Sequence, residues 1–339
     1  MSTDIPAFPQ FYQFTQLVSG SSLLAAQIIE ENQADLVINW LGGFHHAKRF
    51  KASGFCYCND IVLGIQHLLR SFNRILYVDI DVHHGDGVEE AFLTTNRVMT
   101  LSFHQYDEKE KFFPGTGDIK DVGEGDGKYY AINVPLRPGC DNASYHSIFG
   151  KIVDRVMDVY RPDVVWLQCG ADSLRGDLIG GFNVTTRGHG DAVRHMLRYN
   201  VPMILVGGGG YTVENVARCW AYETGLCLGR ELSNELPKNL EYADYYKDEP
   251  VLHFKNTKST YSNMNDEAYL NALLERIMEN LRKIESAPNI GNGEQVPIDY
   301  EIMDQKNWQE VKKDHGGIID SFITKDGSVS NFFDSHHKK

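Results

Sequence analysis

The chain has 339 residues, of which 42% are hydrophobic and 23% charged, and 33 basic against 46 acidic side chains give a formal net charge of −13. This composition is that of a folded globular protein, and no apolar run approaches the roughly 18 to 20 residues that a membrane-spanning helix needs. The excess of negative charge disfavours direct binding to nucleic-acid phosphates and favours cationic partners. The first residues show no secretory signal, so we expect the 6 cysteines to be reduced thiols of the cytosol or nucleus.

Several short apolar runs are predicted to form buried strands, because most of them are continuous rather than alternating in hydrophobicity. They span residues 34–40, 74–81, 98–104, 129–136, 163–170 and 201–206. Segments with helical spacing lie around them, at about residues 14–31, 59–72, 86–95, 143–160, 187–199 and 212–228. This alternation predicts an α/β fold with a mainly parallel sheet that is flanked by helices on both faces.

The chain is expected to contain one domain, because no internal repeat or proline-rich linker interrupts residues 4–230. An amphipathic helix at about residues 266–284 should pack back on this domain, which then covers residues 4–285. Residues 286–339 are polar and rich in glycine, asparagine, aspartate and lysine, so we expect a flexible C-terminal tail.

Polar residues follow several predicted strands at their carboxyl ends, which is where parallel sheets place functional sites. These polar segments are Gly42–His46, Asp79–Asp86, Gly170–Asp172 and Gly207–Tyr211. Their convergence at one edge of the sheet is the strongest functional signal in the sequence.

Asp79, Asp81 and His83 alternate along one strand end, so we expect their side chains to project to the same side. Two neighbouring buried carboxylates are costly unless a cation neutralises them. With Asp172 at the end of another strand, a set of nitrogen and oxygen ligands without thiolate favours zinc or a similar ion in an open catalytic site. A solvated polar turn with one satisfied histidine is the weaker alternative.

His45 and His46 follow a Gly-Gly turn and are predicted to face the metal site as a general acid/base pair. Asp79 and Asp86 could each orient one of the two imidazoles. A pair of structural histidines in a polar loop is the alternative interpretation.

The glycine run Gly207–Gly210 is either a tight strand-to-helix turn or a backbone that a ligand can approach closely. In the second case the Tyr211 hydroxyl could point at a developing oxyanion. No Gly-Lys-Ser/Thr follows the run, so it is not a phosphate loop of the Walker type. Phe55 and Phe113 lie in glycine-flanked segments and are either turn aromatics or walls of a narrow apolar channel.

Taken together, these segments resemble those of the class I zinc-dependent histone deacetylases, within the arginase/deacetylase superfamily. The resemblance is carried by GGFHHAKR, ASGFCYCND, YVDIDVHHGDGVEEAF, FFPGTGD, GADSL, GGGGYT and NVARCW. It covers about residues 4–285 in the same order, with small gaps. It implies zinc-dependent hydrolysis of the acetyl amide of acetyl-lysine in histones, with a role in chromatin and transcription regulation.

The resemblance also implies roles for individual residues. Zinc would be bound by Asp81, His83 and Asp172. His46 would be the general base, paired with Asp86, and His45 its partner, paired with Asp79, while Tyr211 would polarise the acetyl carbonyl. The substrate would contact Asp4, Gly54, Phe55, Phe113, Ile179 and Tyr211. One K⁺ or Na⁺ ion would be bound by Asp79, Asp81, His83, Ser102 and Phe103, and a second by Phe92, Thr95, Val98 and Tyr130.

Acetylated histone tails and corepressor proteins are the expected partners, without direct binding to nucleic acid or membranes, in the nucleus and also the cytoplasm. Members of the family have further residues before the position of Asp4, including a first sheet strand, so we expect an N-terminally incomplete domain. Leu178 and Glu214 stand where the family has basic residues that bind an inositol phosphate, so binding of that ligand is expected to be weak or absent.

Other functions remain open at this stage. The chain could be a catalytically impaired chromatin scaffold, or a deacetylase of small molecules such as acetylated polyamines. An arginase-like enzyme with two manganese ions is disfavoured, because Gly85 stands where the second metal needs a carboxylate.

Overall fold

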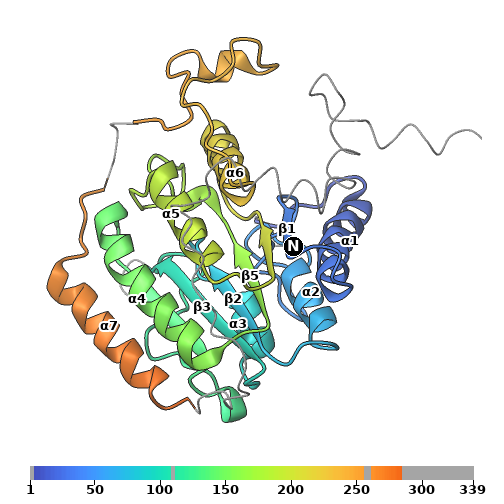
Figure 1. Ribbon diagram of the computed structural model, residues 1–339, viewed down its shortest axis with the longest axis vertical. Helices are drawn as coiled ribbons and strands as arrows, with labels where there is room; N and C mark the ends of the chain where they lie inside the picture. Colours follow the sequence, from blue (N-terminus) through green and yellow to red (C-terminus); the bar gives the residue numbers. More distant parts are fainter. Residues whose placement is uncertain (1–3, 108–110, 256–260, 285–339) are drawn as a thin grey trace, which may run out of the picture. The chain divides into compact units, whose positions relative to one another are not determined.

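The computed structural model of the chain describes residues 4–107, 111–255 and 261–284. A parallel sheet of 6 strands forms the centre of this part, in the order β1-β6-β5-β2-β3-β4 (Figure 1). The strands are β1 (Leu36–Asn39), β2 (Ile75–Asp79), β3 (Val98–Gln105), β4 (Ala131–Leu136), β5 (Val164–Gln168) and β6 (Met203–Val206). The predicted α/β class is confirmed. The expected tail at residues 286–339 lies outside the described residues.

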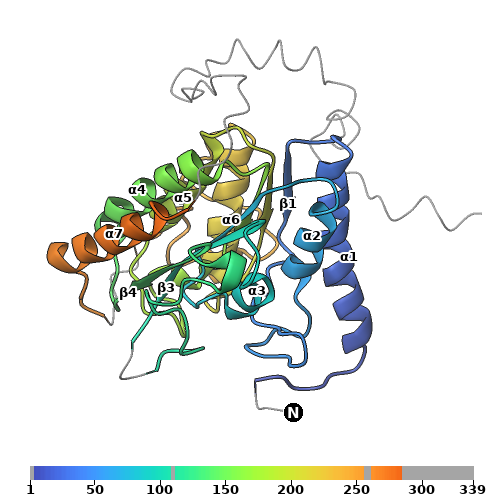
Figure 2. The same cartoon turned by 90° about the horizontal axis from the view of Figure 1, so that it is seen from below.

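Helices cover both faces of the sheet (Figure 2). One face carries α1 (Phe11–Glu30), α2 (Asp60–Leu68) and α3 (Asp86–Phe92). The other carries α4 (Asn142–Tyr160), α5 (Thr186–Leu197), α6 (Val213–Cys227) and α7 (Glu267–Leu281). Among the described residues, no helix combines the length and the apolar character needed to cross a membrane.

Strand β2 shows why the apolar runs are continuous. Ile75 and Tyr77 pack into the cluster below α1 to α3, whereas Leu76 and Val78 pack into the cluster on the α4 side. Every residue of this strand is buried. A strand covered on both faces has no solvent side on which polar residues would be favoured.

The boundaries of several helices follow from capping side chains. In each case the residue before the helix accepts a hydrogen bond from a backbone amide three residues further on. These N-cap residues are Asn59, Asp141, Thr185 and Asp266. Such caps satisfy amides that the first helical turn leaves free, and they place the starts of α2, α4, α5 and α7.

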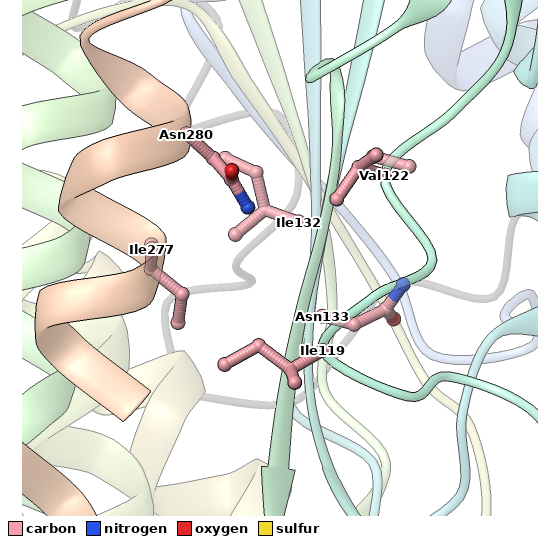
Figure 3. A pocket seen from close by; sticks show the side chains of 7 residues that line it. Ile119, Val122, Ile132, Asn133, Ile277 and Asn280 are labelled. Atoms are coloured by element: carbon pink, nitrogen blue, oxygen red, sulfur yellow. The ribbon is translucent and has the colours of Figure 1, made fainter. Parts of the chain in front are cut away.

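The predicted C-terminal helix is present as α7, and it packs on the domain through Leu270, Leu273, Ile277 and Leu281. Between α7 and β4 a gap of about 10 Å³ remains, with Ile277 facing Ile132 across it (Figure 3). A volume of this size holds at most a single water molecule, so this gap is a packing defect and not a ligand site.

The order in which strands are added to the sheet changes direction between the neighbouring strands β2 and β5. After β2 the chain continues to β3 and β4 at one edge, and after β5 it continues to β6 towards the other edge. The loops that leave β2 and β5 therefore separate, and a crevice forms at the carboxyl ends of the two strands. In the register Asp79 lies opposite Gln168, so the residues that follow, up to Asp81 and Asp172, meet at this crevice.

Candidate active site

A cavity of about 220 Å³ lies at the carboxyl ends of the central strands. Its walls come from all four polar segments that the sequence singles out and from the segment around Phe55. The carboxylate, imidazole and phenol groups among the lining residues belong to His45, His46, Asp81, His83, Asp172 and Tyr211. The fold therefore brings into one cavity groups that are far apart in the sequence.

Asp81, His83 and Asp172 form a buried group whose possible ligand atoms all lie within 4.8 Å of one another. Nδ1 of His83 is 3.1 Å from Oδ1 of Asp81 and 3.0 Å from Oδ2 of Asp172. Burial, together with the charge of Asp81, raises the pKa of Asp172. Two buried carboxylates that share one imidazole, one of them resisting ionisation beside the charge of the other, are a donor set that fits a divalent cation such as zinc.

Neighbouring groups fix the two carboxylates in place. Gln168 Nε2 and the backbone amide of Gly209 each donate to Oδ2 of Asp81 across 2.9 Å. The amide of Val82 donates to Oδ1 of Asp172, also across 2.9 Å. A Cβ atom on Gly209 would lie 1.9 Å from Asp172 Oδ2, so only glycine allows the loop after β6 to come this close.

His45 is paired with Asp79 behind the metal-binding group. Its Nδ1 lies 2.7 Å from Oδ2 of Asp79, which also accepts a hydrogen bond of 2.6 Å from the Tyr77 hydroxyl. Burial alone would lower the pKa of His45, but the charges of Asp79 and Asp81 outweigh it and raise the pKa to about 9. Without a bound cation, this imidazole is therefore protonated at neutral pH.

His46, in contrast, is neutral at neutral pH. Burial and the charge on His45 lower the pKa of His46 to about 3, although its Nδ1 lies 2.8 Å from Asp86 Oδ1. The two imidazole rings are neighbours, with their centroids 3.9 Å apart. A neutral and a protonated imidazole side by side can accept a proton and supply one.

Asp60 holds the loop of Gly43 and Phe44 that precedes the two histidines, a role that the sequence pattern did not reveal. Its buried carboxylate accepts hydrogen bonds from the Phe44 amide at 2.8 Å, the Gly43 amide at 3.0 Å and the Ser22 hydroxyl at 2.6 Å. An acidic residue directly after an asparagine N-cap is typical of a helix start. Only the packing of α1 and α2 shows that this carboxylate faces the loop before His45.

Exposed aromatic rings flank the histidines. Phe55 is 49% exposed and its ring centroid lies 5.9 Å from that of Tyr211, while Phe113 is 41% exposed and lies 4.9 Å from the ring of His46. A Cβ atom on Gly54 would lie 2.5 Å from His46 Cδ2 and 2.9 Å from a Phe113 ring carbon. Phe55 itself has a φ of 63°, a strained conformation for a bulky residue that is often found at functional sites.

The other residues of the expected substrate site lie close by. Asp4 Oδ2 accepts a hydrogen bond of 2.9 Å from the Gly54 amide, so the start of the described chain contacts the Phe55 loop. Ile179 is 45% exposed and lies on the segment that follows Asp172. Their substrate contacts stay predictions.

The residues of the two expected monovalent cation sites lie in different parts of the sheet. Ser102 is opposite Asp79, the partner of His45, in the pairing of β2 with β3. The second set lies where α3 leads into β3 and just before β4: Phe92, Thr95, Val98 and Tyr130. The Phe92 carbonyl accepts from the Thr95 amide at 3.2 Å, and the Tyr130 carbonyl from the Thr100 amide at 2.9 Å. Cation binding at both places stays a prediction.

A second buried group of possible ligands lies behind the Gly170 turn. His189 Nδ1 contacts the carboxylate of Glu223, and His189 Nε2 lies 2.9 Å from the Gly170 carbonyl oxygen. The Cys219 thiol lies 3.6 Å from the same carboxylate. Both ring nitrogens of His189 face oxygen acceptors, so both carry protons and neither has a lone pair for a metal ion. We therefore interpret this group as a buried ion pair that supports the turn before Asp172, not as a second metal site. The 6 cysteines are free thiols, as expected.

A parallel sheet with a carboxylate–imidazole group and two histidine–aspartate pairs at its switch point defines a metal-dependent hydrolase type of site. Residues 1–227 match the family model of the histone deacetylase domain, and the chain belongs to this family. The resemblance to the class I histone deacetylases is thereby confirmed.

Several similar proteins are themselves named histone deacetylases. The chain is 53% identical over 287 residues to a histone deacetylase of Drosophila melanogaster. The aligned residues cover 85% of this chain and 54% of that protein. It is 50% identical over 304 residues to type-1 histone deacetylase 1 of Dictyostelium discoideum, covering 90% and 60% of the two chains. It is also 50% identical over 287 residues to histone deacetylase 1 of Homo sapiens, covering 85% and 58%. The chain thus spans little more than half the length of these relatives.

Proposed function

We propose that the chain hydrolyses the acetyl amide of N6-acetyl-lysine in histones and releases lysine and acetate. The observation that carries this proposal is the cavity in which Asp81, His83 and Asp172 lie beside the two imidazoles and Tyr211. The names of the relatives support histones as the substrate. The net charge of −13 would favour lysine-rich tails.

Asp81, His83 and Asp172 would hold one catalytic zinc ion. When bound, zinc supplies a Lewis acid that polarises the amide carbonyl and lowers the pKa of a water molecule. The fit rests on three buried ligand atoms in one group and on the raised pKa of Asp172, which a cation would bring back towards its ordinary range.

His46 would act as the general base. Its low pKa leaves it neutral, and Asp86 holds Nδ1, so Nε2 is the nitrogen that can take a proton from the attacking water. His45, held by Asp79 and next to the His46 ring, would be the electrostatic or acid partner of the pair. A proton on the imidazole pair would then pass to the lysine nitrogen as the C–N bond breaks.

Tyr211 would donate a hydrogen bond from its hydroxyl to the amide oxygen as that oxygen gains negative charge. Burial and the carboxylate of Asp172 raise the pKa of Tyr211, so the phenol keeps its proton. The lysine methylenes would lie between Phe55 and Phe113, and the flanking peptide would contact Asp4, Gly54 and Ile179.

Further features of the proposed function follow from the family. We infer a K⁺ or Na⁺ ion beside Asp79 and Ser102, corepressor proteins as partners, and work in the nucleus, where histones are. Binding of an inositol phosphate would be weak, because Leu178 is 76% exposed and apolar and Glu214 is acidic.

Acetate release tests the proposal. The purified chain is loaded with zinc and given an acetylated histone-tail peptide or an acetylated polyamine, in parallel reactions with a chelator. Release from the peptide that the chelator stops supports the proposal. Faster release from the polyamine would favour the small-molecule alternative, since polyamines are also cationic. No release from either substrate would favour the scaffold alternative.

A further inference from the structure

Asp177 lies in the segment after β5 and accepts backbone hydrogen bonds from two separate loops. Its Oδ1 accepts from the amides of Ile179 and Gly180, each across 3.0 Å. Its Oδ2 accepts from the amide of Tyr211 across 2.7 Å and from the amide of Thr212 across 3.3 Å. One side chain therefore joins the segment at the rim of the cavity to the loop that carries the phenol.

A second contact joins the same two loops. The hydroxyl of Thr212 donates to the Gly176 carbonyl across 2.9 Å. Thr212 is the residue before α6, yet its side chain does not cap that helix. The Asp177 carboxylate binds the two amides just before α6, near the positive end of this helix, where an anion is favoured.

The hold of Asp177 begins where the glycine run ends. The run itself is bonded at Gly209, whose amide donates to Asp81 and whose carbonyl accepts from the Ala171 amide at 2.7 Å. Gly210 follows with a φ of 144° and has no side chain to restrain the link between Gly209 and Tyr211. Tyr211 is itself only partly buried, so packing of its ring does not fully restrain it. Hydrogen bonds to an ionised carboxylate are about twice as strong as those between neutral groups.

We propose that Asp177 is the positioning residue for Tyr211. It holds the Tyr211 backbone so that the hydroxyl stays at the cavity, and it presents Ile179 at the rim in the same arrangement. This inference rests on the proposed function, because it assigns Asp177 an effect on turnover through Tyr211.

The test is a double-mutant cycle on the zinc-loaded chain. In Asp177→Asn, one acceptor oxygen becomes an NH₂ group that cannot accept from a backbone amide. We expect kcat for an acetyl-lysine peptide to fall about 10- to 100-fold, because a small misplacement of a reacting group has effects of this size. Zinc content should stay within about twofold of wild type, since the ligand group is not altered, and a change in KM would report the Ile179 contact at the rim. In a Tyr211→Phe background the same substitution should change kcat less than about twofold.

A matched control removes the same kind of interaction far from the site. Asp163 Oδ2 accepts from the backbone amides of Asn73 and Arg74, at 2.9 and 2.8 Å, before the amino end of β5. Asp163→Asn should leave kcat unchanged. An equal loss of kcat in the Asp177→Asn and Asp163→Asn variants, or the same loss with Phe at position 211, would show a general effect on stability and overturn the inference.

Two further measurements keep the test decisive. If Asp177→Asn does not fold, Asp177→Glu replaces it in the double-mutant cycle, because Glu keeps the negative charge but places the carboxylate one methylene further from the backbone. If the wild-type chain releases no acetate, the proposed function fails, and amide hydrogen exchange then decides the positioning. Faster exchange at Tyr211 and Thr212 in the variant supports Asp177 as the residue that holds this loop, and unchanged exchange contradicts it.

Discussion

Nδ1 of His46 donates to Oδ1 of Asp86 across 2.8 Å, and this contact leaves Nε2 of His46 as the nitrogen available to the cavity. Burial would raise the pKa of Asp86, but the hydrogen bonds from His46 and Lys48 lower it to about 2. Asp86 is therefore ionised and can only accept, which fixes the tautomer of the imidazole.

This relationship predicts the effect of Asp86→Asn. An amide can present its NH₂ group to Nδ1 and so allow the other tautomer, which places the proton on Nε2. We expect kcat to fall about 10- to 100-fold with zinc still bound, as for other residues that orient an imidazole. Steady-state kinetics with a metal assay on the same sample checks this. Lys48→Met, which leaves the His46–Asp86 contact intact, is the control and should lose much less. An Asp86→Asn variant with full turnover would refute the role of the pair.

Tyr211→Phe should cut kcat about 100- to 1,000-fold, the usual cost of losing one donor to an oxyanion. Zinc content should not change, because the hydroxyl is not in the ligand group. Tyr12 is 63% exposed on α1, and Tyr12→Phe should keep full activity as a control for the substitution itself. Wild-type turnover in the Tyr211→Phe variant would remove this residue from the mechanism.

The two buried ligand groups make different predictions for metal removal. Chelation should lower the thermal unfolding midpoint, and zinc should restore it, because a metal that binds only the folded chain stabilises it. Asp172→Asn should lose most of this zinc-dependent shift. Cys219→Ser should keep it, because we assign Cys219 to the ion pair of His189 and Glu223. If Cys219→Ser alone abolished the shift, the metal site would lie in the other group.

The pKa values of two histidines predict how the stability of the metal-free chain depends on pH. Despite burial, the charges of Asp79 and Asp81 raise the pKa of His45 to about 9, and Asp172 raises that of His83 to about 10, both from 6.5. A raised pKa contributes stability that is complete below pH 6.5 and is lost as pH rises through the folded value. Denaturant unfolding of the metal-free chain should therefore show decreasing stability from about pH 6.5 to pH 10.

The zinc-loaded chain is the control for this pH effect. A bound zinc ion requires His83 to be neutral, so the loaded chain should lose less stability over the same range. Equal pH profiles with and without zinc would show that the two imidazoles do not titrate in this way.

The sequence predicts the fold well because the signals are local. Most strands are continuous apolar runs between turn residues, and several helices begin at a capping side chain such as Asn59. The metal-binding group is also predictable, because Asp81 and Asp172 each follow such a run and parallel strands bring their carboxyl ends together.

The pairs His45–Asp79 and His46–Asp86 agree with the expectation from the sequence, but other supporting contacts could not be predicted because they depend on strand order. Asp177 reaches Tyr211 only because β5 and β6 are neighbours, and Gly43 meets the loop after β6 only because β1 pairs with β6. Glu223 is far along the chain from His189, and nothing in the local pattern of α6 marks it as the partner. These contacts follow from the crossovers of the sheet and not from residue spacing.

Acetate release by the zinc-loaded chain from an N6-acetyl-lysine histone-tail peptide tests the central claim most directly. We expect one acetate for each lysine that is formed, loss of the reaction with chelator, recovery with zinc, and no reaction in Asp172→Asn. A folded, zinc-loaded wild-type chain that releases no acetate from the peptide would contradict it.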